Sequence, residues 1–218
     1  PDQWAGRRKS ISRSLLKWYH STARDLPWRR SPDPYRVWVS EIMLQQTQVE
    51  RVKDYFHRFV TKFPSVFDLA EADEAVVLKY WEGLGYYRRA RQLHAAAKLI
   101  VSDHEGIFPH DACALRQLPG VGRYTAGAIS SISFDLPEPI LEANSRRVLA
   151  RLTHYGRPLS GNKDDQPLWD IAAAIVPPPL QKQPRTNTTS SLSYTLEGTS
   201  LPASPKHALS GIEMPSRG

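Results

Sequence analysis

The chain has 218 residues, 40% of them hydrophobic, so it can bury one sizeable core or two small ones. Its 29 Lys and Arg against 22 Asp and Glu give a formal charge of +7, which suits a polyanionic partner but is shared with many unrelated proteins. No apolar run approaches the roughly 20 residues of a membrane span, and the N-terminus lacks a secretory signal pattern, so we expect a soluble intracellular protein. The single cysteine, Cys113, excludes an internal disulfide framework and a cluster held by several thiolates of this chain.

Helices are predicted throughout residues 1–176. Apolar residues recur at the spacing of one helix face in two stretches, Ile11, Leu15, Trp18 and Tyr19 and then Val52, Phe56, Phe59, Val60 and Phe63. Prolines and glycines separate segments of ordinary helix length at Pro27, 32–34, 63–64, 83–85, Gly106 and 119–122. Ser65 and Asp73 are candidate N-caps. No sustained two-residue alternation is present, so the predicted fold class is all-α.

The composition changes sharply after Val176. Residues 177–218 hold 7 prolines, 12 Ser or Thr and one aromatic residue, Tyr194. Such a segment cannot bury enough apolar surface to offset the entropy lost on ordering. We therefore expect residues 177–218 to be disordered.

A first candidate site lies in residues 34–48. On a continuous helix, Glu41, Gln45 and Gln48 would form a narrow polar stripe flanked by apolar side chains. Partial desolvation would raise the pKa of Glu41 toward neutrality, as a general acid requires. The alternative is the solvated face of an ordinary amphipathic helix.

A second candidate site lies in residues 115–128, where a helix ends near Pro119 and a new helix begins near Arg123. The turn contains Gly120, Val121 and Gly122, whose backbone can approach a phosphate at the positive end of the following helix. Arg123 adds charge. Such a turn binds a nucleic-acid backbone without reading its sequence, although a generic turn of this kind is also an ordinary helix connection.

Four sequence segments resemble one protein family. Residues 118–126 (LPGVGRYTA) are similar to the helix-hairpin-helix of the endonuclease III superfamily of DNA glycosylases. Residues 26–29 (LPWR), 37–49 (VWVSEIMLQQTQV) and 83–91 (GLGYYRRAR) resemble its MutY-like, adenine-specific mismatch glycosylases. The resemblance covers roughly residues 10–176. It implies a helix-hairpin-helix glycosylase fold and double-stranded DNA with adenine opposite 8-oxoguanine or guanine as partner.

The resemblance also implies roles for individual residues. Glu41 matches the general acid that protonates adenine, which must first be flipped out of the duplex. The positions that line the adenine site or enter the DNA near it are Arg24, Trp28, Arg29, Leu44, Gln45, Gln46 and Tyr86, the last as a wedge. The backbone-binding hairpin comprises Gly120, Val121, Gly122, Arg123 and Thr125. Trp28 and Leu44 could equally be core residues, and Tyr86 an unremarkable residue at a helix start.

Tyr124 stands where strand-cleaving members of the superfamily carry a lysine that forms a Schiff base. The resemblance therefore implies hydrolysis of the N-glycosidic bond alone, with the strand left intact. An endonuclease III-like glycosylase and lyase remains an alternative.

Residues 142–144 depart from the family pattern. Glu142, Ala143 and Asn144 stand where the family has Asp, Gly and Asn, the Asp stabilising the sugar cation. We expect Glu142 to serve as the second carboxylate, with Asn144 beside it. An ordinary surface glutamate at a helix start is the alternative, and the substitution also leaves open a catalytically impaired DNA-binding remnant.

The resemblance sets the predicted domains and cofactors. Residues 1–20 would be a helix of a second, incomplete helical domain, 21–138 a six-helix barrel with the hairpin at 115–134, and 139–176 the remaining helices of the second domain. Family members carry a 4Fe-4S cluster on four cysteines. This chain lacks those cysteines, so we expect it to bind no metal or cofactor. We also expect a truncated chain, with an apolar surface left exposed on its first helix and a tail unlike the family. The protein would be a monomer that does not bind membranes, cytoplasmic in a bacterium and nuclear or mitochondrial in a eukaryote.

Overall fold

A computed structural model describes residues 2–156 and 166–177. Every regular element among them is helical, which confirms the predicted all-α class. In chain order they are α1 (Asp2–Thr22), the 3-10 helix η1 (Pro27–Arg29), α2 (Pro34–Leu44), α3 (Val49–Lys62), α4 (Val66–Glu71), α5 (Glu74–Trp81), α6 (Arg88–His104), α7 (Ala112–Leu115), α8 (Arg123–Phe134), α9 (Ala143–Leu152) and α10 (Gln166–Ile175). Each predicted break lies at or next to a helix boundary. Disorder was predicted for residues 177–218, of which residues 178–218 lie outside the described residues.

Helix α2 lies at the centre of the main core. It contacts η1, α3, α6 and α8, and Trp38, Val39 and Met43 are completely buried on it. The predicted stripe of α3 is also buried, and its Phe59 ring packs edge-on against Trp81 of α5 at 5.9 Å. Because α2 is enclosed on several sides, a polar side chain on an enclosed face lies in a largely apolar environment, whereas Arg36 of the same helix is exposed.

The helix starts follow ordinary capping chemistry. Ser65 accepts a hydrogen bond from the Asp68 amide, and Asp68 accepts one in return from the Ser65 amide at 3.0 Å, which completes a capping box at α4. Asp73 also occupies an N-cap position, as predicted, but its side chain makes no capping hydrogen bond. The hairpin differs from the prediction at one end, because α7 already ends at Leu115 and a turn, not a helix, runs through Pro119.

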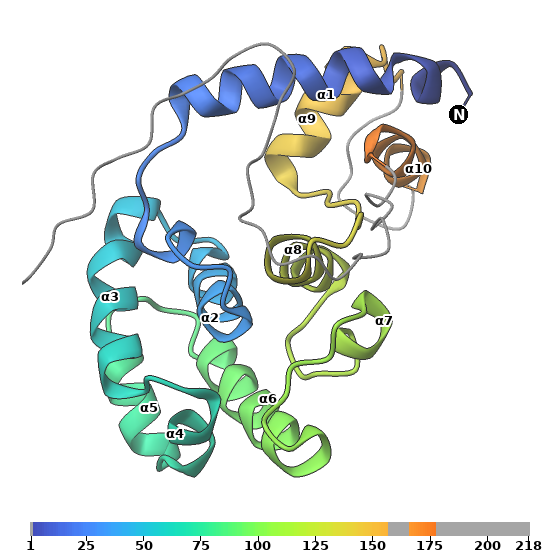
Figure 1. Ribbon diagram of the computed structural model, residues 1–218. Coiled ribbons are helices and arrows are strands. Elements are labelled where there is room, and N and C mark those ends of the chain that lie inside the picture. Colours follow the sequence, from blue (N-terminus) through green and yellow to red (C-terminus); the bar gives the residue numbers. More distant parts are fainter. Residues whose placement is uncertain (1, 157–165, 178–218) are drawn as a thin grey trace, which may run out of the picture. The chain divides into compact units, whose positions relative to one another are not determined.

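Helices α1, α9 and α10 form a second group, in which α10 contacts both others. Figure 1 shows this group on one side of α8 and helices α3 to α6 on the other. The apolar side chains of α1 face solvent, with Leu15 at 57% and Trp18 at 59% exposed. The expected exposed apolar surface of the first helix is therefore present. All of these helices lie within one compact unit, residues 1–180, and the boundaries predicted inside it remain a prediction.

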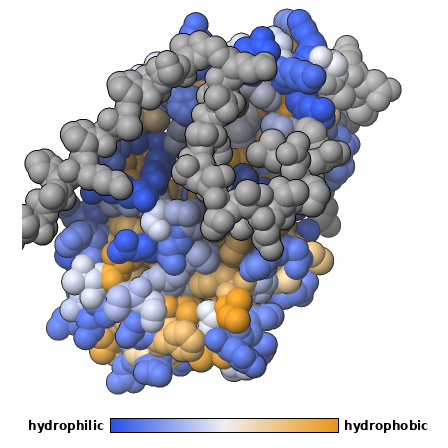
Figure 2. All heavy atoms as spheres, in the orientation of Figure 1, coloured by the Kyte–Doolittle hydropathy of each residue, from blue (hydrophilic) through white to orange (hydrophobic). Residues whose placement is uncertain are grey.

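A second apolar area lies on the opposite side of the main core. Figure 2 shows apolar side chains gathered on the lower part of the face in view, where Figure 1 places α4 and the end of α6. The exposed apolar residues here include Phe67 of α4 and Ile107, which lies three residues after the end of α6. Within the described ranges, no helix has both the length and the apolar character that crossing a bilayer requires.

Candidate functional site

Glu41 lies near the C-terminal end of α2 and is partly buried. Burial raises the pKa of its carboxyl group, and the negative charge of Glu142 acts in the same direction. A hydrogen bond from Tyr124 and the positive charge of Arg29 lower the pKa, but burial is the largest effect. The expected desolvation of Glu41 is therefore present, and a carboxyl group so placed holds its proton closer to neutral pH.

Tyr124 reaches Glu41 from the first turn of α8. Burial raises the pKa of its phenol well above the usual range, and the neighbouring charges of Glu41 and Glu142 add to this effect. The hydroxyl group therefore stays protonated and acts as a hydrogen-bond donor toward the Glu41 carboxyl group. Four predicted site residues from η1, α2, α8 and the start of α9 thus interact electrostatically at one place: Arg29, Glu41, Tyr124 and Glu142.

Glu142 is the N-cap of α9. Its Oε1 accepts hydrogen bonds from the amides of Asn144 at 2.7 Å and Ser145 at 2.8 Å, while the Ser145 hydroxyl accepts one from the Glu142 amide. An anion is favourable at this end of a helix. Both bonds to the carboxylate converge on Oε1, so Oε2 lies outside them. The side chain of Asn144 is exposed and accepts a hydrogen bond from Arg147.

Trp28 and Arg29 are neighbours in η1, but their side chains lie in different environments. Trp28 is buried and packs edge-on against Phe56 at 5.5 Å, so it belongs to the core. Arg29 is exposed, donates to the Arg24 carbonyl at 3.3 Å, and lies 5.6 Å from the Tyr19 ring centre. The side chain of Arg24 is exposed, and Leu44 is partly buried against the core.

The predicted polar stripe on a single helix is wrong. Helix α2 ends at Leu44, Gln45 is its C-cap, and Gln48 is the N-cap of α3. The helix cannot continue because Gln46 adopts a left-handed φ of 58° and turns the chain. Gln45 instead points toward α8, where its amide donates to the Thr125 hydroxyl at 3.5 Å, and Gln46 is exposed.

Tyr86 shows the same backbone feature. Its φ is 50°, also left-handed, and its side chain is 62% exposed. Non-glycine residues in this region store strain that the surrounding structure must support, and they cluster at functional sites. Of the three residues expected to enter the DNA, Gln46 and Tyr86 are exposed and have a left-handed φ, whereas Gln45 is partly buried.

The hairpin between α7 and α8 has the expected local geometry. Gly120 has a φ of 76°, and a Cβ atom there would lie 2.9 Å from the Gln92 Cβ, so glycine is required. Gly122 is the N-cap of α8, whose first-turn amides have no partner within the helix. Val121 and Thr125 are buried, so only their backbone can face an anion.

Arg123 makes contacts to α10 rather than standing free. Its guanidinium lies 3.8 Å from the Trp169 ring centre, and its Nη1 donates to Gln166 at 3.2 Å. A phosphate at this hairpin would compete with α10 for the Arg123 side chain.

One residue of the site was not identified from the sequence. Arg89 is 8% exposed, and its guanidinium donates hydrogen bonds to the end of α2, to the loop after α2 and to the loop before α6. Its position was detectable, because the buried face of α6 includes Arg89 together with Leu93, Ala96, Ala97 and Ile100 at helical spacing. A charged residue on such an apolar stripe must find polar partners in the core.

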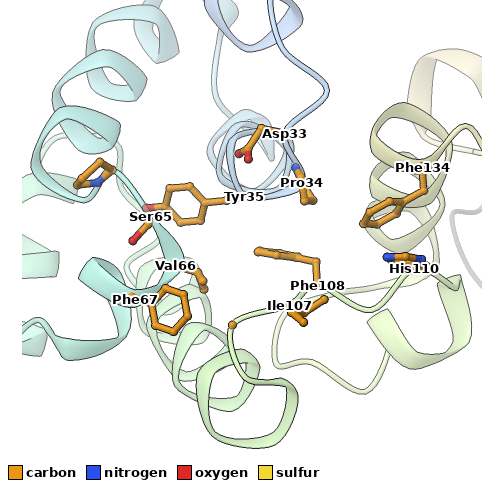
Figure 3. Close-up of a pocket in the computed structure, with 12 residues that line it drawn as sticks. Asp33, Pro34, Tyr35, Ser65, Val66, Phe67, Ile107, Phe108, His110 and Phe134 are labelled. Carbon is orange, nitrogen blue, oxygen red and sulfur yellow. The ribbon is translucent and has the colours of Figure 1, made fainter. Parts of the chain in front are cut away.

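A hollow of about 360 Å³ lies elsewhere in the main core, at the N-terminal end of α2. Figure 3 shows its walls, among them Tyr35, Phe67 and Phe108, with His110 lying against Phe134. Glu41 is seven residues farther along α2, or about 10 Å at 1.5 Å per residue. This hollow is therefore separate from the cluster around Glu41.

Metal-binding groups are absent from the residues that the structure describes, since nowhere among them do three His, Cys, Asp or Glu side chains gather. Cys113 is exposed on the short helix α7 and is the only cysteine in the sequence. A cluster that needs four thiolates does not fit this donor set.

Comparison with known proteins places these features in a family. Residues 39–165 match the family described as HhH-GPD superfamily base excision DNA repair protein. An adenine DNA glycosylase of Rattus norvegicus is 45% identical over 178 residues, 78% of this chain and 34% of the relative. An adenine DNA glycosylase of Buchnera aphidicola subsp. Acyrthosiphon pisum is 42% identical over 168 residues, 77% of this chain and 48% of the relative.

A solved structure supports the same placement. A thermostable thymine-DNA glycosylase matches with a TM-score of 0.71 and 29% identity, over 79% of each chain. The present chain spans about a third to a half of the length of the two adenine glycosylases. It therefore corresponds to one part of those proteins.

Proposed function

Because this chain belongs to the HhH-GPD superfamily of base excision DNA repair proteins, we propose that it is the catalytic part of an adenine DNA glycosylase that acts on adenine opposite 8-oxoguanine or guanine. The observation that carries this proposal is the cluster of Glu41, Tyr124, Arg29 and Glu142, in which burial raises the pKa of the central Glu41. The adenine glycosylases that share 42–45% identity with this chain support the choice of base.

The proposed reaction uses two carboxyl groups in different states. Protonated Glu41 gives its proton to a ring nitrogen of the flipped adenine, and the N-glycosidic bond breaks with its electron pair moving to the base. The sugar is left as an oxocarbenium-like cation, which the Glu142 carboxylate stabilises until water adds to the sugar carbon, and the proton that this water loses goes to the Glu41 carboxylate. The products are free adenine and an abasic site.

Tyr124 supports simple hydrolysis. A phenol whose pKa is raised by burial stays protonated, so it does not attack the sugar carbon as a lysine amine would. Its hydroxyl group instead donates to Glu41 and orients that carboxyl group. We therefore propose that the enzyme leaves the strand intact.

Binding to DNA would use contacts that do not read sequence. The amides at the start of α8 and the glycine turn before it can hold a phosphate, and the net charge of +7 attracts the duplex. Trp28 is buried, at 6% exposed, whereas Arg24, Arg29, Gln46 and Tyr86 are exposed.

The test is to incubate the full chain with duplexes that carry adenine opposite 8-oxoguanine, guanine or thymine. Free adenine is measured directly, abasic sites are revealed with alkali, and a borohydride reaction tests for a covalent adduct. We expect release from the first two duplexes, no adduct, and no strand break without alkali. An adduct, or release of a pyrimidine instead of adenine, would contradict the proposal.

A second candidate is a DNA-binding protein with little glycosylase activity, and the position of Glu142 favours it. The carboxylate is folded back onto the amides of its own helix, and a misplacement of about 1 Å can cost on the order of a hundredfold in rate. The variant Glu142→Asp separates the two candidates, because Asp is an equally good N-cap and has the shorter side chain of the family pattern. A rise in adenine release of about a hundredfold in this variant would favour the second candidate for the natural chain.

A further inference from the structure

Of the five exposed non-glycine residues with a left-handed φ in the described part of the chain, two are expected to enter the DNA: Gln46 and Tyr86. Gln46 lies in the loop between α2 and α3, and Tyr86 lies in the loop between α5 and α6. The two residues are 40 positions apart in sequence, and each has a left-handed φ, 58° and 50° respectively. If both side chains enter the same DNA duplex, their loops must be held at a fixed spacing.

The Arg89 guanidinium joins these two loops. Its Nη1 donates to the carbonyl groups of Ile42 at 2.9 Å and Met43 at 3.0 Å, and to the Gln45 carbonyl, all at the end of α2. Its Nη2 donates to the Thr47 hydroxyl at 3.2 Å and to the carbonyl groups of Leu84 at 3.4 Å and Gly85 at 3.3 Å. One nitrogen thus holds the loop of Gln46, and the other connects that loop to the residues directly before Tyr86.

The geometry requires an arginine. A planar guanidinium presents two nitrogens that point to different partners in a fixed fork, whereas a lysine ammonium is a single point. The acceptors are carbonyl and hydroxyl oxygens rather than a carboxylate, so the buried charge is balanced by dipoles, including the negative end of α2. Tyr86 also lies beside the same guanidinium, which is 5.5 Å from its ring centre.

We propose that Arg89 is a positioning residue that fixes the spacing of the Gln46 and Tyr86 loops, so that both side chains enter the DNA together and extrude the target base. This inference rests on the proposed function. It adds a residue that makes no contact with substrate and acts only through Gln46 and Tyr86.

The test measures base extrusion and does not depend on catalysis. The full chain is titrated onto a duplex with 2-aminopurine at the target position opposite 8-oxoguanine, because 2-aminopurine is bright only when it leaves the base stack. For Arg89→Lys we expect the fluorescence gain at saturation to fall about tenfold. Affinity for the duplex should change by no more than about twofold, because phosphate contacts supply most of it.

The matched control is Arg91→Lys, two residues farther along α6. Arg91 is exposed and pairs with Glu74 at 3.2 Å, a contact that lysine can keep. It should leave the fluorescence gain unchanged. If Arg89→Lys does not fold by circular dichroism, Thr47→Val serves as the second variant, since it removes the one acceptor of Nη2 in the Gln46 loop, and we expect a smaller loss in the same direction.

A double-mutant cycle separates positioning from a merely structural role. In a Tyr86→Ala background, the effect of Arg89→Lys on the fluorescence gain should be smaller than in the natural chain, because only its effect through Gln46 remains. Independent effects of the two changes would overturn the inference, and so would a natural chain that binds the duplex with no gain at all. A natural chain that gives the gain but releases no adenine would instead contradict the proposed function alone.

Discussion

Glu41 is placed where a negative charge is costly. Burial raises the pKa of its carboxyl group above the ordinary value of 4.5, so the folded protein holds this proton at pH values where the unfolded chain has lost it. Stability from this group is therefore present at low pH and decreases as the pH rises through the raised pKa. The same protonated form is the proposed acid, so activity should fall in the same direction.

Replacement of Glu41 by Gln separates these effects. We expect Glu41→Gln to lower adenine release by about 10²- to 10⁴-fold, the usual contribution of a general acid. Its melting temperature should match the natural chain near pH 4.5 and exceed it at pH 8, by about 2–4 °C for each kcal/mol of relieved desolvation. Thermal unfolding at the two pH values checks this, and a variant that is less stable at pH 8 would show that the carboxylate is favourably paired there.

At this scale, the sequence indicated the environment of Glu41 but not the partners of Arg89. The apolar neighbours of Glu41 are adjacent in sequence and remain buried around it. Four of the six partners of Arg89 lie 42–47 residues away, at the end of α2 and in the loop after it, a distance that helical periodicity does not report. Glu142 was predicted only in part. The helix start at this position was expected, but the hydrogen bonds that the Glu142 side chain accepts from the amides of that helix were not.

Helix α8 packs closely against the segment that leads to Glu142. A Cβ atom on Gly127 would lie 2.8 Å from the Pro139 carbonyl oxygen and 3.2 Å from the Ile140 side chain. Because the nearer atom belongs to the backbone, Gly127→Ala must displace residues 139–142. We expect it to lower the free energy of unfolding by about 1–3 kcal/mol relative to a neutral glycine substitution, as measured by urea denaturation.

The control for this prediction is Gly6→Ala in α1. A Cβ atom there meets nothing within 4 Å, so alanine should gain up to about 1 kcal/mol of helix stability. Equal stability changes in the two variants would mean that α8 and residues 139–142 can separate without cost.

Among the elements, the helices and most of their breaks could be predicted from the positions of proline and glycine and from the spacing of apolar residues. The end of α2 could not be predicted in this way. The sequence of residues 37–49 contains no proline or glycine, so nothing local stops the helix at Leu44. The end is set by Gln46, whose φ is left-handed, and by Arg89, which takes the last carbonyl groups of α2. Tertiary contacts therefore overrode a helical pattern that would otherwise have continued.

On the surface of the molecule, apolar side chains of α1 are exposed to solvent. Leu15 and Trp18 are more than half exposed, and such surface promotes association. We expect the double variant Leu15→Gln and Trp18→Gln to lower light scattering at high protein concentration while changing the free energy of unfolding by less than about 0.5 kcal/mol. The contrasting change is Leu168→Gln on α10, fully buried, which should cost about 2–5 kcal/mol. If the double variant and Leu168→Gln lowered the free energy of unfolding by similar amounts, the face of α1 would have to be packed against other residues.

The contact between Arg123 and Trp169 gives the chain an optical property of its own. A positive charge 3.8 Å from the ring centre alters the energy of the excited indole, and Trp38 and Trp81 are fully buried in the other group of helices. When a phosphate at the hairpin draws Arg123 away from the ring, we expect the emission maximum of Trp169 to shift and the emission of Trp38 and Trp81 to stay unchanged. The sequence has six tryptophans, so the difference in ultraviolet fluorescence between the natural chain and a Trp169→Phe variant should follow how quickly the hairpin docks, with no label attached.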